Sequence, residues 1–215
     1  MKITVICSNP KHPVYKYLEN WMQQNSQTYD IALLTTVKDI KMAGDILFLL
    51  SCSEIVRKSI RNLFSYSLVL HASDLPEGKG WSPHIWDVVN GKNTLTLSLL
   101  NAEDRVDSGD IWQKKIIKLQ GNELYDEINH KLFKAELELM SWACENIENA
   151  IATPQKSDVA SYHRKRTPED SKLDVNQSII SQFNLLRVCD PQRFPAYIEI
   201  NNQRYNIRLE KSDDK

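Results

Sequence analysis

One histidine and one aspartate have sequence surroundings typical of reactive side chains. His71 ends an apolar run, Leu68 to Leu70, and a loop rich in glycine and proline follows it directly. A strand that ends in this way places an imidazole at the carboxyl edge of a sheet, where open α/β folds bind their ligands. Asp107 comes shortly after another strand-like run, Leu95 to Leu100. Two parallel strands would bring the imidazole and the carboxylate together, an arrangement suited to general acid–base chemistry.

Both residues also have a purely structural interpretation. A histidine after a strand is often a hydrogen-bonded structural side chain, and an aspartate before a Ser-Gly pair is often a turn residue. The spacing of His71 and Asp107 by itself therefore leaves both interpretations open.

The stretch around these residues resembles the formyltransferases that use 10-formyltetrahydrofolate, a family that includes methionyl-tRNA, glycinamide ribonucleotide and sugar N-formyltransferases. The motifs that carry the resemblance occur in the family's order: Val69-Leu70-His71, Ser73-Asp74-Leu75-Pro76, Lys79-Gly80 with Pro83, Asn90-Gly91 and Asp107-Ser108-Gly109. The resemblance implies that His71 and Asp107 are catalytic. The imidazole would stabilise an oxyanion or relay a proton, and the carboxylate would orient the imidazole and help to remove the amine's proton.

One position departs from the family pattern. The family's asparagine falls on Val69, whose side chain cannot donate a hydrogen bond. In the family, that amide is thought to hold the formyl oxygen as it becomes an oxyanion. Protonated His71, Ser73, Asn101 or a backbone amide could take its place, and the sequence does not choose among them.

The resemblance also implies where the formyl donor, 10-formyltetrahydrofolate, would bind. The loop Ser51 to Ile55 would contact the pterin ring, and the backbone from Glu103 to Val106 would recognise the donor and acceptor groups on its edge. The candidate cofactor-binding residues are Cys52, Ser53, Ile55, Glu103, Asp104 and Val106. From the residues alone, Ser53 is as well explained as the N-cap of a following helix, and acidic loop residues are usually solvated.

The acceptor is harder to infer. The pattern LHASDLPEGKGWSPHIW, followed by HRKRTPED, resembles small sugar N-formyltransferases of pseudaminic-acid-type pathways. This implies a nucleotide-linked amino sugar, UDP-4-amino-4,6-dideoxy-N-acetyl-β-L-altrosamine, as acceptor. The candidate substrate-binding residues are Ser73, Lys79, Trp81, Arg164 and Arg166. The basic cluster of residues 164–166 is more simply a solvated turn, although it could also hold phosphate groups. A 10-formyltetrahydrofolate hydrolase and a non-catalytic folate or sugar-nucleotide binding module are the alternatives.

Composition limits the possible partners. The chain has 215 residues, 41% of them hydrophobic, and a net charge of −1, so no overall field attracts it to nucleic acid or to an anionic membrane. The length and the lack of a separate basic carboxyl-terminal domain disfavour a tRNA substrate. No apolar stretch is long enough to cross a bilayer, and no signal peptide begins the chain. We therefore expect a cytoplasmic protein, either a monomer or a homodimer.

Cysteine spacing argues against a metal site. Cys7, Cys52, Cys144 and Cys189 are far apart, and none forms a CxxC pair. We expect buried free thiols and no bound metal.

Hydrophobic patterns predict an α/β fold with a doubly wound, mostly parallel, Rossmann-like sheet. No glycine-rich fingerprint follows the first strand, which disfavours a dinucleotide cofactor. We expect a catalytic domain over residues 1–152 and an extension over residues 153–215 with a basic segment, a short helix and a β-hairpin. The expected strands are Ile3–Cys7, Ile31–Thr35, Ile46–Leu50, Ser67–His71, Thr94–Leu100 and Ile111–Leu119, with the hairpin at Tyr197–Ile200 and Tyr205–Leu209. The expected helices are Val14–Gln24, Glu54–Phe64, Pro83–Val89 with His84 on its surface, Asn122–Ile147 and Asn176–Asn184.

Overall fold

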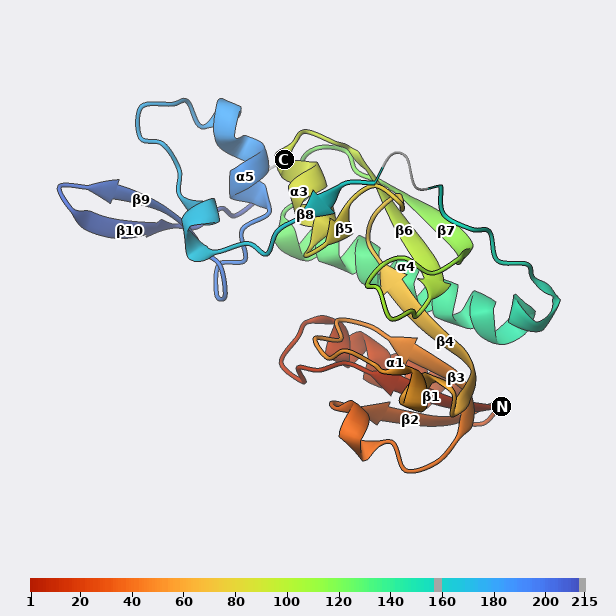
Figure 1. Ribbon diagram of the computed structural model, residues 1–215. Helices are drawn as coiled ribbons and strands as arrows, with labels where there is room; N and C mark the ends of the chain where they lie inside the picture. The colour runs from red at the N-terminus through yellow and green to blue at the C-terminus, as the bar shows by residue number, and fades with distance from the viewer. Residues whose placement is uncertain (157–159, 213–215) are drawn as a thin grey trace.

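A computed structural model describes residues 1–156 and 160–212 of the chain (Figure 1). Its centre is a six-stranded sheet with the order β2-β1-β3-β4-β6-β7. The strands are β1 (Lys2–Ile6), β2 (Asp30–Leu34), β3 (Gly44–Leu49), β4 (Phe64–His71), β6 (Thr94–Asn101) and β7 (Ile111–Lys118). The first four run parallel, whereas β6 is antiparallel to both β4 and β7. The expected mostly parallel α/β sheet is therefore confirmed.

Helices cover the two faces of the sheet unequally. One face packs against α1 (Val14–Asn25), α4 (Tyr125–Asn146) and α3 (Pro83–Val89), and it buries the larger hydrophobic core. Within the described part of the chain, the opposite face is covered by the 3-10 helix η1 (Val37–Asp39), the single turn α2 (Lys58–Arg61) and the loops around them. The thin cover on the second face leaves the loops at the strand ends accessible.

Two expected helices differ from the structure. The helix predicted over residues 54–64 is only the turn α2, because residues 51–57 cross the sheet edge as an irregular loop. Ser53 therefore caps no helix, and its amide instead binds Ser8 Oγ at 3.0 Å. The helix predicted over residues 176–184 is replaced by the 3-10 turn η4 (Ile180–Gln182) and by α5 (Phe183–Arg187). There the Asp174 carboxylate accepts the backbone N–H of Asn176 at 2.9 Å, a local bond that competes with helix formation.

The segment after α4 returns to the loop between β4 and α3 before it forms the C-terminal part. The 3-10 turn η2 (Ile147–Asn149) ends α4, and β8 (Tyr162–His163) then pairs in parallel with β5 (Lys79–Gly80). The turn η3 (Pro168–Ser171) leads on to the hairpin of β9 (Ala196–Ile200) and β10 (Gln203–Ile207). The expected hairpin is therefore present, with its second strand beginning two residues earlier than predicted, and Figure 1 shows it projecting away from the main sheet.

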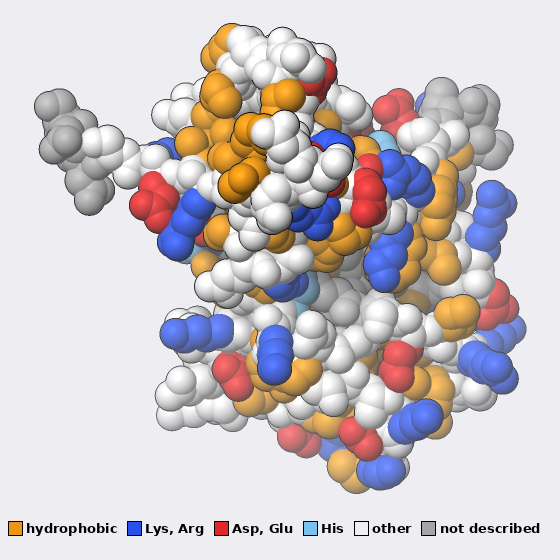
Figure 2. Space-filling model, turned by 90° about the vertical axis from the view of Figure 1, so that its left-hand side faces the viewer, with side chains coloured by type: hydrophobic (Ala, Val, Ile, Leu, Met, Phe, Trp, Pro, Cys, Tyr) orange, Lys and Arg blue, Asp and Glu red, His pale blue; other side chains and the backbone are white. Residues whose placement is uncertain are grey.

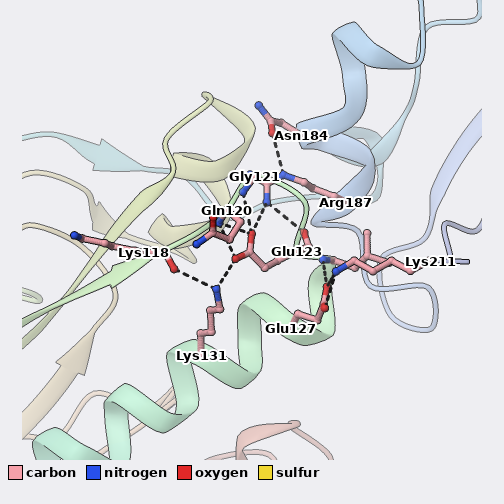
Figure 3. A network of polar contacts seen from close by, with 10 residues as sticks. Lys118, Gln120, Gly121, Glu123, Glu127, Lys131, Asn184, Arg187 and Lys211 are labelled. Atoms are coloured by element: carbon pink, nitrogen blue, oxygen red, sulfur yellow. Dashed lines mark hydrogen bonds and ion pairs between the residues drawn. The ribbon is translucent and has the colours of Figure 1, made fainter. Parts of the chain in front are cut away.

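A buried arginine fastens the C-terminal part to the rest of the molecule. Arg187 of α5 is 1% exposed, and its Nη1 donates to the carbonyl oxygen of Glu123 at 3.2 Å (Figure 3). The Glu123 carboxylate in turn accepts backbone N–H groups of Gln120 and Gly121 and pairs with Lys131. Burial alone would raise the pKa of Glu123, but these partners lower it to about 2. The network keeps the turn before α4 in contact with α5.

The part of the chain that the structure describes contains no helix long and apolar enough to cross a membrane. All four cysteines are free thiols; Cys7, Cys144 and Cys189 are buried, and Cys52 is half-buried. Within the described ranges, no group of three or more metal-ligating side chains is found.

Candidate active site

The structure brings His71 and Asp107 together. His71 is the last residue of β4, and its Nδ1 lies 3.4 Å from Oδ1 of Asp107. Both residues are 8% exposed. The parallel pairing expected from the sequence is wrong, because β6 runs antiparallel to β4. The carboxylate reaches the imidazole because residues 102–110, the loop that follows β6 and is here called the β6 loop, turn back across the end of β4.

The other ring nitrogen of His71 also faces an oxygen. Its Nε2 lies 2.9 Å from the carbonyl oxygen of Gly78. A neutral imidazole has one N–H and can donate only once, whereas the protonated ring can donate to both oxygens. Both ring nitrogens of His71 therefore face an oxygen acceptor.

Backbone groups hold Asp107 in an uncommon conformation. Its φ is 54°, in the left-handed region that aspartate and asparagine tolerate better than most residues. The backbone N–H of Gly80 donates to Asp107 Oδ2 at 2.9 Å, and Gln155 Nε2 donates to the Asp107 carbonyl at 3.1 Å. Gly80 thus fixes the carboxylate of Asp107, and Gln155 fixes the backbone of the same residue.

Gly109 explains why the motif ends in glycine. A Cβ at this position would lie 2.0 Å from the backbone oxygen of Asn101, which no rotation of a side chain could relieve. The close approach of the β6 loop to the end of β6 therefore requires glycine, and it brings Asp107 back toward His71.

The structure narrows the candidates that could replace the missing amide at position 69. Val69 packs against the hydrophobic cluster on the face of the sheet that η1 and α2 cover. His71 lies on the same face of β4, because alternate strand residues share a face. Asn101 is excluded: its Oδ1 accepts Trp112 Nε1 at 2.7 Å, and Trp112 packs in the core on the opposite face of the sheet. Ser73, in contrast, is 1% exposed, and its Oγ has no hydrogen-bond partner among the residues that the structure describes. Among these candidates, Ser73 has a side-chain hydroxyl that is still able to donate a hydrogen bond.

The predicted cofactor residues lie on two loops beside the end of β4. Residues 50–57, called here the β3 loop, carry Cys52, Ser53 and Ile55, and the β6 loop carries Glu103, Asp104 and Val106. Cys52 and Ala102, one from each loop, pack against the same hydrophobic cluster. Ile55 is 75% exposed and Val106 is 62% exposed. The two loops therefore offer unpaired apolar surface at the edge of the sheet, which suits a flat ring system.

Glu103 and Asp104 do not face this apolar surface as free carboxylates. Both side chains pair with Arg61 Nη2, at 3.8 Å and 2.8 Å respectively. This leaves backbone groups and apolar side chains of the β6 loop as its candidate ligand contacts.

The predicted acceptor residues fall into two groups. Ser73 and Lys79 belong to the loop between β4 and α3, and Lys79 continues into the short β5–β8 sheet. Trp81 follows at 44% exposure, with Lys165 Nζ 4.9 Å from its ring centroid. The basic segment thus lies directly beside the loop that follows His71.

Arg164 and Arg166 are partly engaged within their own segment. Arg164 is exposed and pairs with Asp170, its Nη1 lying 2.7 Å from Oδ2. Arg166 donates through Nη2 to the Asp170 carbonyl at 2.9 Å, but its buried Nε has no partner. Arg166 is therefore the better placed of the two to receive a ligand oxygen.

Two histidines that the sequence did not single out lie near the site. His84 was expected on a helix surface, which is wrong: its Nδ1 is buried without a hydrogen-bond partner. Burial, followed by the charges of His71, His12 and Arg166, lowers the pKa of His84 to about 4. Burial and Arg193 lower the pKa of His12 to about 4 as well. Pro83, a residue typical of the first turn of a helix, could have indicated this position, because it places His84 in the first turn of α3, next to the loop after His71.

A separate cavity lies toward the C-terminal part, and none of the candidate catalytic, cofactor-binding or substrate-binding residues lines it. It has a volume of about 550 Å³, and its lining includes Lys11 and Pro13 on one side and Tyr125, Arg193 and Leu209 on the other. Figure 2 shows a hollow between the N-terminal half of the molecule and the C-terminal part above it. The space extends from the loop after β1 to the segments that follow α4.

Comparisons with known proteins agree with this architecture. No family model matches the chain. In sequence it is 28% identical over 169 residues to methionyl-tRNA formyltransferase from Rickettsia africae, an alignment that covers 78% of this chain and 55% of that protein. The chain thus spans about half the length of the curated relatives that it matches.

Solved structures match over nearly the whole chain. Methionyl-tRNA formyltransferase from Clostridium thermocellum superposes with a TM-score of 0.83 at 21% identity, over 100% of this chain and 95% of that one. A 4-N formyltransferase from Francisella tularensis gives 0.77 at 15% identity, over 99% and 98%. HypX from Aquifex aeolicus in complex with tetrahydrofolic acid gives 0.80 at 16% identity, over 95% and 36%. These comparisons confirm the resemblance and the fold expected from the sequence.

Proposed function

We propose that this chain, which resembles the 10-formyltetrahydrofolate-dependent formyltransferases in sequence and has their fold, transfers a formyl group from 10-formyltetrahydrofolate to the amine of a nucleotide-linked amino sugar. The observation that carries the proposal is the contact of His71 with Asp107 at the carboxyl end of β4. An imidazole and a carboxylate so arranged can move a proton and stabilise negative charge in one place.

The residues beside this pair suit the formyl donor. The β3 loop presents exposed Ile55 and half-buried Cys52, the β6 loop presents exposed Val106, and a pterin ring needs apolar contacts of this kind. Cys52, Ser53, Ile55 and Val106 are the side chains that we propose to lie against it. When bound, the donor supplies an activated formyl group on nitrogen.

The chain's own residues would supply the proton chemistry. The Asp107 carboxylate, fixed by Gly80 N–H, would hold the imidazolium of His71 in place and accept the proton that the attacking amine loses. His71, in its protonated form, would stabilise the negative charge that develops on the formyl oxygen. It would then give a proton to the folate nitrogen as the bond from that nitrogen to the formyl carbon breaks, and Asp107 would return the amine's proton to the imidazole. Ser73 Oγ, buried and unpartnered, would donate the hydrogen bond that Val69 cannot.

The proposed acceptor is an amino sugar joined to a nucleotide. The 4-N formyltransferase of Francisella tularensis shares the fold over nearly the full length of both chains. The near-neutral net charge of −1 lacks the basic field with which proteins attract nucleic acid. Residues 1–152 would form the catalytic part and residues 153–215 an acceptor-binding extension, with Lys79, Trp81, Arg164 and Arg166 around the acceptor.

Methionyl-tRNA is the rival acceptor, because the sequence relatives are methionyl-tRNA formyltransferases. Water is a second rival, since a hydrolase of 10-formyltetrahydrofolate would use the same His71 and Asp107. The test is to incubate the protein with 10-formyltetrahydrofolate and, separately, UDP- and dTDP-linked 3-amino and 4-amino sugars, methionyl-tRNA or buffer alone. We expect a formylated amino-sugar nucleotide, detected by mass. Formyl-methionyl-tRNA as the preferred product, or formate without any added amine, would overturn the proposed acceptor.

A further inference from the structure

Arg61 lies behind the two loops to which we assign the folate donor, and it joins them directly. Its side chain is 8% exposed at the end of α2. Nη1 donates to the carbonyl oxygen of Val56 in the β3 loop at 2.6 Å. Nη2 donates to Asp104 Oδ1 in the β6 loop at 2.8 Å. One guanidinium therefore bridges two segments that β4 separates in the sheet.

We propose that Arg61 is a positioning residue that fixes the spacing of the β3 and β6 loops, and that its contacts with Val56 and Asp104 set the affinity for the folate donor. This inference rests on the proposed function. It gives Glu103 and Asp104 a different task from the one expected from sequence: they anchor the loop instead of contacting the pterin.

The surroundings of Arg61 explain why a single side chain has this effect. Val56 is 6% exposed and belongs to the hydrophobic cluster against which Cys52 and Ala102 pack. Packing at Val56 therefore holds the end of the β3 loop against the sheet. The Arg61 carbonyl accepts Ser67 Oγ at 3.3 Å, and the Ser67 carbonyl accepts Ala102 N–H at 2.7 Å. These two hydrogen bonds thus hold the end of α2 and the root of the β6 loop to β4.

The tip of the β6 loop has a different support. Asp104 and Glu103 are the residues there that reach Arg61, and Val106 follows them with 62% of its surface exposed. Without the guanidinium, the tip would lose its link to the β3 loop. The donor would then have to order the tip as it binds, and ordering mobile side chains and loops weakens affinity.

Substitutions separate this role from catalysis. Arg61→Met removes both contacts, Arg61→Lys keeps the charge near Asp104 but cannot also reach Val56, and Asp104→Asn weakens the ion pair from its exposed side. Because Asp104 is 77% exposed, the last variant leaves the core intact. Lys58→Met, an exposed change one turn earlier on α2, is the matched control.

The experiment measures the dissociation constant of 5-formyltetrahydrofolate, which binds without donating its formyl group, together with KM and kcat for 10-formyltetrahydrofolate. We expect Arg61→Met to raise the dissociation constant and KM by about tenfold, in line with the cost of ordering a loop on binding, with kcat within about twofold of wild type. Asp104→Asn and Arg61→Lys should shift both in the same direction by a smaller factor. Lys58→Met should match wild type.

Two results would overturn the inference: wild-type folate affinity in both Asp104→Asn and Arg61→Met, or a loss in kcat at unchanged KM. Failure of the proposed function would look different, because the wild-type protein itself would then neither bind the folate nor transfer the formyl group. If Arg61→Met does not fold, Asp104→Asn decides the question on its own.

Discussion

The imidazole of His71 and the carboxylate of Asp107 lie 3.4 Å apart at their nearest nitrogen and oxygen, although 36 residues separate them in the chain. Their approach does not depend on neighbouring parallel strands. It depends on the β6 loop, which bends back at Gly109 and is held by Gly80 and Gln155. The sheet therefore positions His71 at the end of β4, and the loops position Asp107 against it.

Replacing either member of the pair tests its role. His71→Asn and Asp107→Asn should each reduce kcat by a factor on the order of 10² to 10⁴, the usual contribution of a positioned acid–base group. Asparagine tolerates the φ of 54° at position 107, so Asp107→Asn should fold normally. Steady-state kinetics with circular dichroism as the folding control checks both points. Near-wild-type turnover in either variant would remove that residue from the mechanism.

Ser73 offers a test in which activity and stability move independently. Because its Oγ is buried without a partner, removing the hydroxyl should leave the free energy of unfolding unchanged or slightly higher. If that hydroxyl replaces the missing asparagine, Ser73→Ala should nevertheless reduce kcat by about 10²-fold, the typical effect of losing one oxyanion donor. Urea unfolding and kinetics on the same preparation measure both. Full activity in Ser73→Ala would assign the oxyanion to His71 or to a backbone amide.

Lys165 is an exposed cation of the basic segment that lies over the Trp81 ring. Neither Lys165 nor the less exposed Arg166 has an acidic side-chain partner among the described residues, whereas Arg164 is held by Asp170. We expect Lys165→Met to raise KM for the acceptor by about fivefold to tenfold, because an unpaired cation is free to bind phosphate. Arg164→Met should raise the same KM by a smaller factor, because Arg164 already pairs with Asp170. Equal KM values for Lys165→Met and wild type would exclude Lys165 from acceptor binding.

Glu136 of α4 makes the folded state sensitive to pH. Its carboxyl is buried with Oε2 unpartnered, and burial raises its pKa from 4.5 to about 8. Below pH 4.5 both the folded and the unfolded chain are protonated there. As pH rises toward 8, the unfolded chain ionises while the folded chain retains its proton, so this group progressively lowers the free energy of unfolding.

Glu136→Gln, which resembles the protonated acid, should therefore be more stable than wild type near pH 8, and the difference should shrink near pH 5. Urea unfolding at the two pH values measures it. A constant difference between the two proteins across this range would contradict the assignment. Glu127→Gln, at a carboxylate on the surface of α4 that pairs with Lys211, is a suitable comparison.

The fold was largely predictable from the sequence for a physical reason. Runs such as Ile46–Leu49 are apolar at every position, a pattern typical of a central parallel strand, and the period of α4 marks one continuous buried face. The antiparallel direction of β6 was not predictable in this way, because a strand's hydrophobic pattern is the same in either direction. The short β5–β8 pairing was also missed, since two-residue strands have no period to detect.

The site was predictable in part. The positions of His71 and Asp107 followed from the motif order, whereas the task of Arg61 could not, because it depends on contacts between loops. His84 was assigned to a helix surface because the sequence does not show what covers the first turn of α3. The predicted boundary at residues 152 and 153 stays a prediction.

The sequence also does not show which hydrophobic side chains of the C-terminal part are exposed to solvent. The structure shows that five of them are, on the side of the molecule seen in Figure 2: Val175, Ile179, Ile180, Ile200 and Tyr205.

Formylation of an amino-sugar nucleotide is the most direct test of the account. Wild-type protein, His71→Asn and heat-inactivated protein should be incubated with 10-formyltetrahydrofolate and the UDP-linked 4-amino sugar, and the product analysed by mass spectrometry. We predict a mass gain of one formyl group at the amine with wild type, and at least about 10²-fold less product with His71→Asn over the same time. No folate-dependent product across the whole amino-sugar panel, or an equal yield from His71→Asn, would contradict it.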